Sequence, residues 1–311
     1  MKLRGLSLAL AAAGLAWSTP AYAWDELGHR VVARIAWDHM TPAARQNAVR
    51  LLQAAPPGSG IAELMPRTGS MDERQREWFV HTAVWADMIR DREHPGARYA
   101  HADWHYVNFF WEQRVPGGSP IDRSDRGTDG ELLNQLPRVA ATLADAAAGD
   151  SARSVALAWF LHLVGDAHQP LHNSARITAQ DPQGDRGGNL FLLGGMYPRS
   201  NLHGYWDAVV GFSVPWGVGE RDEAAYVGRV SALLARRYTP AWSRGRLLPS
   251  RYEQWSREGL ALAEHTLYPA WLVRGQPAPA RYQPVAWAAA QPRLALAGYR
   301  VADLLNRALG S

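Results

Sequence analysis

Apolar residues recur at helical spacing along most of this chain, and alternating strand-like runs are scarce. Apolar positions such as Leu27, Val31 and Ile35 recur every three to four residues, and Thr41-Pro42 has the form of a cap followed by proline in the first turn. The same criteria predict further helices over 42–54, 74–89, 129–147, 151–169, 223–237, 251–268 and 284–309, with Asp129 and Ser151 as N-caps. Two stretches, 94–128 and the glycine-rich 173–201, fit no helix. The sequence therefore predicts an all-α fold.

Composition narrows the class of protein further. With 311 residues, of which 47% are hydrophobic and 20% charged, the chain can bury a large core, which excludes a disordered or collagen-like protein. The formal net charge of +4 is small and its signs are mixed, so charge alone does not indicate a nucleic-acid binder. Cysteine is absent, which excludes disulfides, thiolate nucleophiles and sulfur-ligated metals. Any metal ion must be bound by nitrogen and oxygen.

The first 23 residues have the pattern of a secretory signal peptide. Two basic residues precede an apolar run over 6–17, and the small-residue triplet Ala21-Tyr22-Ala23 follows as a cleavage site. We expect residues 1–23 to be removed and residues 24–311 to form one domain that begins at Trp24. No later run reaches the roughly 18 apolar residues of a membrane span. The mature protein is predicted to be periplasmic or secreted, without a membrane anchor.

Two His–Asp pairs are the main candidates for a functional site. His162 and Asp166 lie four residues apart on one predicted helix, so both can reach one ion, and His203 and Asp207 repeat that spacing. His172 follows the first pair, and the glycine-rich stretch separates it from the second. A single pair of this kind is most simply a hydrogen bond on a helix surface. Two pairs with a third histidine between them indicate a metal site instead.

The order of the motifs resembles a known family. The chain carries Trp24 with His29 five residues later, W-A-D-x-x-R over 85–90, H-Y-x-N over 105–108, H-x-x-x-D-x-x-Q-P-L-H over 162–172, G-G-N over 187–189 and N-L-H-x-x-W-D over 201–207. These motifs closely resemble the S1/P1 nucleases, the zinc-dependent single-strand nucleases of fungi, plants and bacteria. The absence of cysteine and of N-x-S/T sequons fits a bacterial member of that family.

The resemblance implies a single, mainly helical domain with three Zn²⁺ in a cleft, a fold shared with trizinc phospholipase C. By the same resemblance, one zinc is bound by the α-amine and carbonyl of Trp24 with His29 and Asp166, a second by Asp87, His105, His162 and the same Asp166, and a third by His172, His203 and Asp207. Imidazole and carboxylate are ligands that suit zinc. Three carboxylates against three dications leave the pocket positive, which attracts phosphodiesters.

The implied activity is hydrolysis of single-stranded DNA and RNA to products with a 5′-phosphate, together with 3′-nucleotidase activity. Hydroxide activated by zinc, with Asp166 bridging two ions, would attack phosphorus, so that no protein nucleophile is needed. Arg90 would bind a phosphate oxygen in the transition state. The resemblance gives Tyr106 and Asn108 the contacts to the nucleobase. Single-stranded nucleic acid and 3′-nucleotides are thus the expected partners, and no protein partner is indicated.

Two alternatives stay open at this point. A trizinc phospholipase C would use much the same ligands on phospholipid head groups, and a non-catalytic periplasmic zinc-binding protein would keep the ligands without a reaction. Three further residues have expected places. We expect His168 to support the ligands or to lie at the surface, Asn189 to order the loop near His172, and Ala208 to leave out a phosphate contact that asparagine would make.

Overall fold

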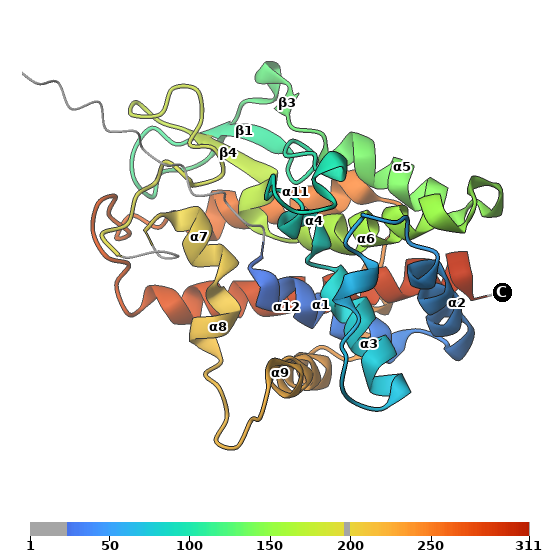
Figure 1. Ribbon diagram of the computed structural model, residues 1–311. Coiled ribbons are helices and arrows are strands. Elements are labelled where there is room, and N and C mark those ends of the chain that lie inside the picture. The colour runs from blue at the N-terminus through green and yellow to red at the C-terminus, as the bar shows by residue number, and fades with distance from the viewer. Residues whose placement is uncertain (1–23, 196–199, 311) are drawn as a thin grey trace, which may run out of the picture.

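The structure is a computed structural model that describes residues 24–195 and 200–310, so the predicted signal peptide lies outside the described residues. The α-helices are α1 (Glu26–His39), α2 (Pro42–Gln53), α3 (Met71–Thr82), α4 (Trp85–Met88), α5 (Leu132–Ala144), α6 (Asp150–Asp166), α7 (Leu202–Asp207), α8 (Val209–Ser213), α9 (Glu223–Arg237), α10 (Pro240–Ser243), α11 (Tyr252–Leu262) and α12 (Tyr282–Leu309). In Figure 1, α12 and α1 run through the middle of the molecule, with α5, α6 and α11 on one side and α3 and α9 on the other. The mainly helical fold is confirmed.

Helix α1 shows how the sequence builds this centre. Asp25 is its N-cap, and the Asp25 side chain accepts a hydrogen bond from the backbone of Gly28. The apolar face of α1, which includes Val32 and Ile35, is buried and packs mainly against α12. A Cβ on Gly298 of α12 would lie 2.6 Å from Ile35, so glycine is needed for this close approach. Burial of a side chain such as Ile35 contributes about 1.5–3 kcal/mol.

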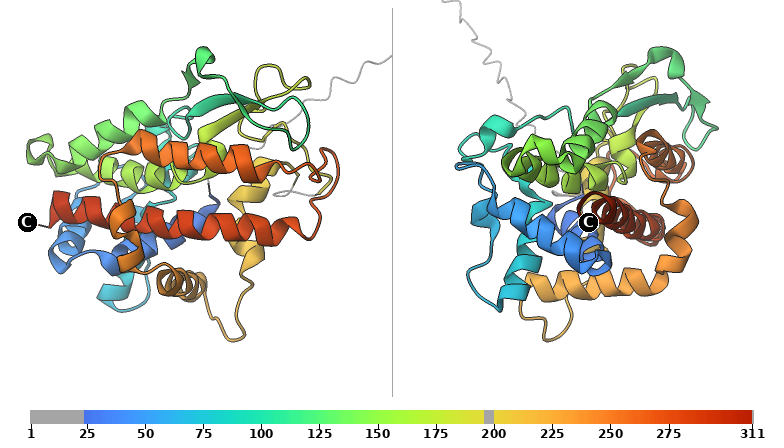
Figure 2. Two further views of the ribbon diagram at one scale, coloured as in Figure 1. Left: turned by 180° about the vertical axis from the view of Figure 1, so that it is seen from behind. Right: turned by 90° about the vertical axis from the view of Figure 1, so that its right-hand side faces the viewer.

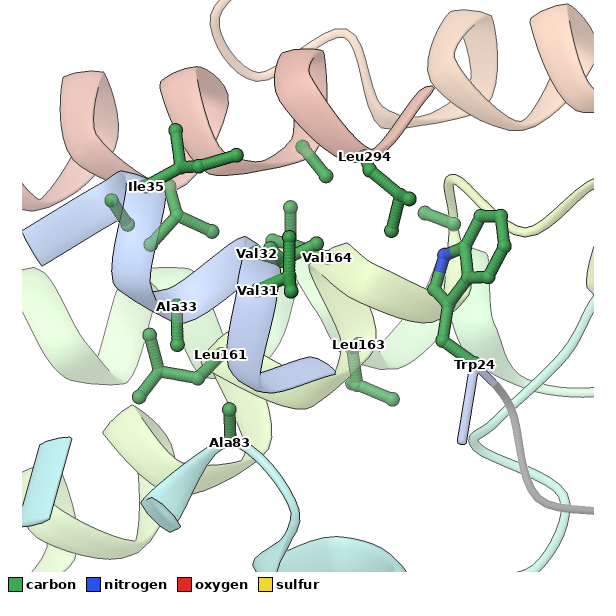
Figure 3. Packing of buried hydrophobic residues seen from close by; sticks show 14 of the residues in the cluster. Trp24, Val31, Val32, Ala33, Ile35, Ala83, Leu161, Leu163, Val164 and Leu294 are labelled. Carbon is green, nitrogen blue, oxygen red and sulfur yellow. The ribbon is translucent and has the colours of Figure 1, made fainter. Parts of the chain in front are cut away.

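Helix α6 is buried over most of its length and carries the first His–Asp pair. Every residue from Ala156 to Asp166 is buried, because α5, α2, α12 and α1 surround the helix. Figure 3 shows Leu161 and Val164 of α6 packing with Val31 of α1 and Leu294 of α12. The polar end of α6, with His162 and Asp166, is therefore held by a rigid apolar core.

A small sheet occupies the two stretches that fit no helix. Strand β1 (Asn108–Glu112) pairs antiparallel with β2 (Ile121–Asp122) and β3 (Thr128–Asp129), and pairs parallel with β4 (Ser174–Ile177) on its other edge. The ladder extends beyond β4, because Val107 N donates to His172 O at 2.8 Å. The expectation of an all-α fold is corrected to this extent: the fold is mainly helical with one mixed sheet.

Several predicted helix limits were wrong. The predicted helix 74–89 is two helices, α3 and α4, separated at Ala83 and Val84. The N-cap of α5 is Glu131 rather than Asp129, because Asp129 lies in β3 and pairs with Asn108. Gly149 precedes α6 with a φ of 76°, which places Ser151 inside the first turn instead of at the cap.

The predicted helix 251–268 divides into α11 and a π-helical turn over Ala263–Leu267. In contrast, α9 begins and ends at the residues that the sequence predicts. None of the helices in the described part of the chain is both long and apolar enough to cross a membrane.

Candidate metal centre

Eight buried histidine and aspartate side chains from distant parts of the chain converge at the end of α6. Their metal-ligating atoms fall into three groups, each with all atoms within 4.8 Å: His29, Asp87 and His162; His105, His162 and Asp166; and His172, His203 and Asp207. Helices α1, α4, α6 and α7, the turn before β1 and the short 3₁₀ helix Pro170–Asn173 supply them. These eight are all of the histidines and aspartates that the sequence predicts as ligands.

His162 has a fixed tautomer. Its Nδ1 lies 2.8 Å from the carbonyl oxygen of Ala83, which can only accept, so Nδ1 carries the proton and Nε2 carries a lone pair. That Nε2 faces His105 Nδ1 at 3.0 Å, Asp166 Oδ2 at 3.4 Å and Asp87 Oδ1 at 3.8 Å. Four ligand-type atoms thus surround one point.

Asp166 faces two groups at once. Its Oδ2 lies 3.2 Å from His105 Nδ1, whereas its Oδ1 lies 3.4 Å from His29 Nε2 and has no hydrogen-bond donor among the described residues. A carboxylate with its two oxygens directed to different imidazoles can bridge two cations. This is the geometry that the predicted bridging role of Asp166 requires.

His29 enters the centre through a gap left by glycine. Neither of its ring nitrogens has a hydrogen-bond partner in the described part of the structure, although the ring is fully buried. The ring stacks on His162 with centroids 4.0 Å apart. A Cβ on Gly165 would lie 2.6 Å from His29 Nδ1, so only glycine at this position of α6 leaves room for the ring.

The third group contains two imidazoles that face each other through lone pairs. Nδ1 of His172 donates to the carbonyl of His105 at 2.6 Å, and Nδ1 of His203 donates to the carbonyl of Gly187 at 2.7 Å. Both Nε2 atoms are therefore unprotonated, yet they lie only 3.1 Å apart, with Asp207 Oδ2 3.6 Å from His203 Nε2. Two acceptors and a carboxylate at this separation repel one another unless a cation lies between them.

Burial sets the charge of these groups. It lowers the pKa of His162 to about 3 and that of His203 to about 4, so both imidazoles are neutral at pH 7, which is the form that binds metal. Burial also raises the pKa of Asp87 to about 7. The pKa of Asp166 is raised well above its usual range, first by burial and then by the charges of Asp87 and Asp207. Bound cations would relieve this cost.

Comparison with known proteins agrees with this geometry. The model of the S1/P1 Nuclease family matches residues 24–310. The chain belongs to this family. Among its relatives, Nuclease P1 of Penicillium citrinum is 23% identical over 299 residues, covering 93% of this chain and 98% of the fungal protein.

Two further relatives match over shorter spans. Nuclease S1 of Aspergillus oryzae is 24% identical over 200 residues, covering 64% of this chain and 58% of that protein. Endonuclease 2 of Arabidopsis thaliana is 23% identical over 228 residues, covering 71% of this chain and 66% of that protein. This S1/P1 nuclease is therefore a hydrolase of nucleic acid, with His/Asp groups that could hold metal ions.

Trp24 and Arg90 both lie at the edge of the nuclease's ligand groups. Trp24 is fully buried, and the next backbone N–H, that of Asp25, donates to the carbonyl of Asp207 at 2.9 Å. This contact places the backbone at Trp24 beside the third group. Arg90 Nη1 lies 3.4 Å from Asp87 Oδ1, and the Arg90 side chain is 22% exposed. A guanidinium thus reaches both a predicted ligand and solvent.

Tyr106 and Asn108 lie next to the predicted ligand His105, where the chain enters β1. The Asn108 amide donates to Asp129 Oδ2 at 3.3 Å and is nearly buried. Tyr106 is partly exposed, and a Cβ on Gly130 would lie 2.6 Å from its ring, so the β3–α5 connection covers part of the ring. Both predicted base-contact residues thus lie beside a predicted ligand.

The structure selects one of the two places expected for His168 and gives Asn189 a contact within its own loop. His168 is fully buried, which excludes the surface position; its Nδ1 contacts the carbonyl of Val164 at 2.7 Å, and its Nε2 lies 2.7 Å from Arg300 Nη1. It supports the end of α6 from behind. Asn189 donates to the carbonyl of Arg186 at 2.8 Å, so it orders its own loop.

Several atoms that orient the predicted ligands were not among the residues predicted from the sequence. These are the carbonyls of Ala83, His105 and Gly187, and the side-chain amide of Gln169, which donates to Asp207 Oδ1 at 2.7 Å. Gln169 could have been noticed within the Q-P-L-H motif. The carbonyls carry no sequence signal, because every residue has one.

Proposed function

We propose that this nuclease is a zinc-dependent phosphodiesterase that hydrolyses single-stranded DNA and RNA to products with a 5′-phosphate and also has 3′-nucleotidase activity. One observation carries the metal requirement: the lone pairs of His172 and His203 face each other at 3.1 Å with a carboxylate beside them. The same family membership disfavours a phospholipase, because the relatives compared above are named as nucleases.

The residues fit three zinc ions. His29 and Asp166, with the amine and carbonyl of Trp24, would hold the first; Asp87, His105, His162 and the other oxygen of Asp166 would hold the second; and His172, His203 and Asp207 would hold the third. When bound, zinc supplies an activated water and positive charge for phosphodiester hydrolysis. The ligands are neutral imidazoles and carboxylates, which is the donor set that zinc prefers when sulfur is absent.

The remaining predicted site residues would bind the substrate. The Arg90 guanidinium is anchored beside Asp87 and is partly exposed, so it can donate to a phosphate oxygen that enters the centre. The partly exposed ring of Tyr106 can stack on a base, and the Asn108 amide beside it can hydrogen-bond that base. Splayed bases are available in single strands and not in a duplex, which supports a single-strand preference.

The test of this function is a substrate panel combined with metal analysis. The protein beginning at Trp24, loaded with zinc, should contain three ions and hydrolyse single-stranded DNA, RNA and 3′-nucleotides faster than duplex DNA. Chelation should abolish these activities and added zinc should restore them. Hydrolysis of phosphatidylcholine instead would establish the phospholipase alternative, and stoichiometric zinc without any hydrolysis would establish the non-catalytic one.

We further propose that residues 1–23 are a signal peptide whose removal, on export to the periplasm or medium, frees the Trp24 amine for zinc. The chain offers a direct test, because Lys2 is its only lysine. In the protein that begins at Trp24, the α-amine is therefore the sole primary amine. Zinc should protect it from an amine-reactive dye, and chelation should expose it. Equal labelling with and without zinc would remove Trp24 from the ligand set.

A further inference from the structure

The positive charge of the protein is concentrated in one short segment. Residues 236–251, here called the arginine segment, contain five arginines and no acidic residue. Residues 24–311 as a whole contain 31 basic and 29 acidic residues, for a net charge of +2. Without the arginine segment, the remainder has 26 basic and 29 acidic residues, for a net charge of −3. The segment thus reverses the sign of an otherwise acidic protein.

The guanidinium groups of this segment are available to a partner. All five arginines, which are Arg236, Arg237, Arg244, Arg246 and Arg251, are exposed. The acidic residues that follow them in the chain are paired elsewhere, Glu253 with Arg257 and Glu258 with Arg293 and Arg300. No ion pair in the described part of the chain involves an arginine of the segment. Their charges are therefore not compensated by the protein.

Aromatic rings are interleaved with these charges. The rings of Tyr238 and Trp242 are partly exposed and lie 4.9 Å apart between centroids. The guanidinium of Arg246 lies 4.9 Å from the Trp242 ring, and that of Arg237 lies 5.8 Å from the Tyr238 ring. A guanidinium stacked on a ring keeps its N–H donors directed outward in a defined plane.

The segment is held rigidly against the body of the protein. Tyr299 of α12 donates to the carbonyl of Tyr238 at 2.7 Å, and Arg300 donates to the carbonyls of Arg246 and Leu247 at 2.7 and 3.1 Å. Arg300 also contacts His168, two residues after Asp166. Seen from behind, the segment lies across α12, as Figure 2 shows in orange. The segment is therefore ordered. Its last arginine, Arg251, lines a pocket together with Phe109 and Thr128, which are the chain neighbours of Asn108 and Asp129.

We propose that the arginine segment is a second binding surface for single-stranded nucleic acid, separate from the metal centre. Unpaired guanidinium groups bind phosphates, and the aromatic rings offer stacking to bases of any sequence. An anionic membrane would also be attracted by the charge, but among the described residues no exposed large hydrophobic side chain lies in the segment, so it offers a bilayer no apolar anchor. The proposal rests on the proposed function for the class of substrate.

A consequence is that the surface acts only on long strands. A dinucleotide or a 3′-nucleotide occupies the metal centre alone, whereas a strand of tens of nucleotides can contact the arginine segment at the same time. Such a second contact makes capture of the strand intramolecular and raises its effective concentration at the metal centre. Preference for long strands should therefore depend on the segment, and cleavage of the shortest substrates should not.

The experiment compares two triple variants of the zinc-loaded protein. The first, Arg236→Gln/Arg237→Gln/Arg244→Gln, removes three charges from the segment. The matched control, Arg67→Gln/Arg138→Gln/Arg221→Gln, removes three exposed arginines that form no ion pair in the described structure. The measurement is kcat/KM for a long single strand and for a dinucleotide at several salt concentrations.

We expect a difference on the long strand only. Each lost phosphate contact reduces the slope of log affinity against log salt by about 0.7, so three contacts reduce it by about 2. Between about 50 and 200 mM salt, the unmodified protein and the control should lose roughly 20-fold more in kcat/KM on the long strand than the segment variant. On the dinucleotide, all three proteins should be equal.

Three outcomes would overturn the proposal. The first is equal salt slopes for the segment variant and the control on the long strand, and the second is a loss of kcat/KM by the segment variant that is as large on the dinucleotide as on the long strand. The third is binding of the segment to phosphatidylglycerol vesicles with no effect of the variant on strand cleavage. Failure of the proposed function is a separate result, in which the unmodified protein cleaves neither substrate. In that case, the surface is tested by fluorescence anisotropy, which measures the binding of the intact long strand to the segment variant and to the matched control.

Discussion

Gly165 lies between two predicted ligands on α6, and its replacement by alanine tests the geometry of the centre. The added Cβ would lie 2.6 Å from Nδ1 and 2.7 Å from Cε1 of His29, where ordinary contact begins at 3.4 Å. The His29 ring is fully buried and stacked on His162, so it cannot turn away into solvent. Gly165→Ala must therefore displace the ring by about 0.8 Å, the difference between the two distances.

The expected magnitudes separate stability from function. Alanine in a helix interior is favoured over glycine by about 1 kcal/mol, and overpacking costs about 1–3 kcal/mol, so the free energy of unfolding should fall by no more than about 2 kcal/mol. Metal–ligand distances tolerate only about 0.2 Å, so the displaced imidazole should no longer bind. We expect the variant to lose one zinc and, because a 1 Å misplacement can cost about 100-fold, at least that factor in kcat.

The chain supplies a matched control. Gly298→Ala places a Cβ at the same distance, 2.6 Å, from Ile35 in the apolar α1–α12 contact. This variant should lose stability and keep its zinc and its turnover. In the double variant Gly165→Ala/His29→Ala the clash is absent, so the double-mutant cycle in unfolding free energy should show coupling between the two sites.

The assays are elemental analysis of the purified protein, urea unfolding and hydrolysis of single-stranded DNA. If Gly165→Ala retains three zinc ions and near-normal turnover, His29 is not a ligand and the reasoning is refuted. If Gly298→Ala loses metal to the same extent, general loosening of α1 is responsible and the specific displacement of His29 is wrong.

Three further variants test other parts of the centre. Asp166→Asn should reduce zinc content by more than one ion, because the two oxygens of Asp166 face different ligand groups; loss of one ion or none would contradict bridging. Asp185→Asn should lower zinc content by one. Buried Asp185 accepts hydrogen bonds from Arg176 N at 2.9 Å and Tyr268 OH at 2.6 Å, and so holds the loop whose Gly187 carbonyl orients His203. Intact zinc content would show that the loop holds its shape without the carboxylate. Tyr106→Ala should weaken single-strand binding by about 1–3 kcal/mol, measured as KM or by anisotropy, and leave zinc content unchanged; an unchanged affinity would remove the stacking role.

The sequence predicts the helices well where one apolar face is clear. Helix α9 agrees at both ends, because Asp222 caps it through a hydrogen bond from Ala225 and its buried residues follow one stripe. The sheet escapes prediction, because β2 and β3 have two residues each and β1 is almost fully buried, so no alternating pattern exists. Asp129 was misassigned for the same reason, since pairing with Asn108 decides its conformation.

The grouping of the ligands is predictable within a helix and not between elements. The spacing of His162 and Asp166 places both on one face of α6, and the structure brings their ligand atoms within 3.4 Å of each other. In contrast, the gap at Gly165 depends on the approach of α1, which no local pattern encodes. The predicted ligands on other elements came from the resemblance to the S1/P1 nuclease family, because residue spacing alone could not indicate them.

The orientation of the predicted ligands depends mainly on the backbone. His162, His172 and His203 each donate Nδ1–H to a main-chain carbonyl, so the fold fixes their tautomers and directs the Nε2 lone pairs inward before any ion binds. Any residue at position 83 supplies such a carbonyl, whereas Gly187 must lack a side chain, because a Cβ there would lie 2.3 Å from the carbonyl oxygen of Leu171. A centre oriented in this way constrains few side chains beyond the ligands themselves. This explains in physical terms how a chain only 23% identical to Nuclease P1 can bring eight histidines and aspartates together at one point.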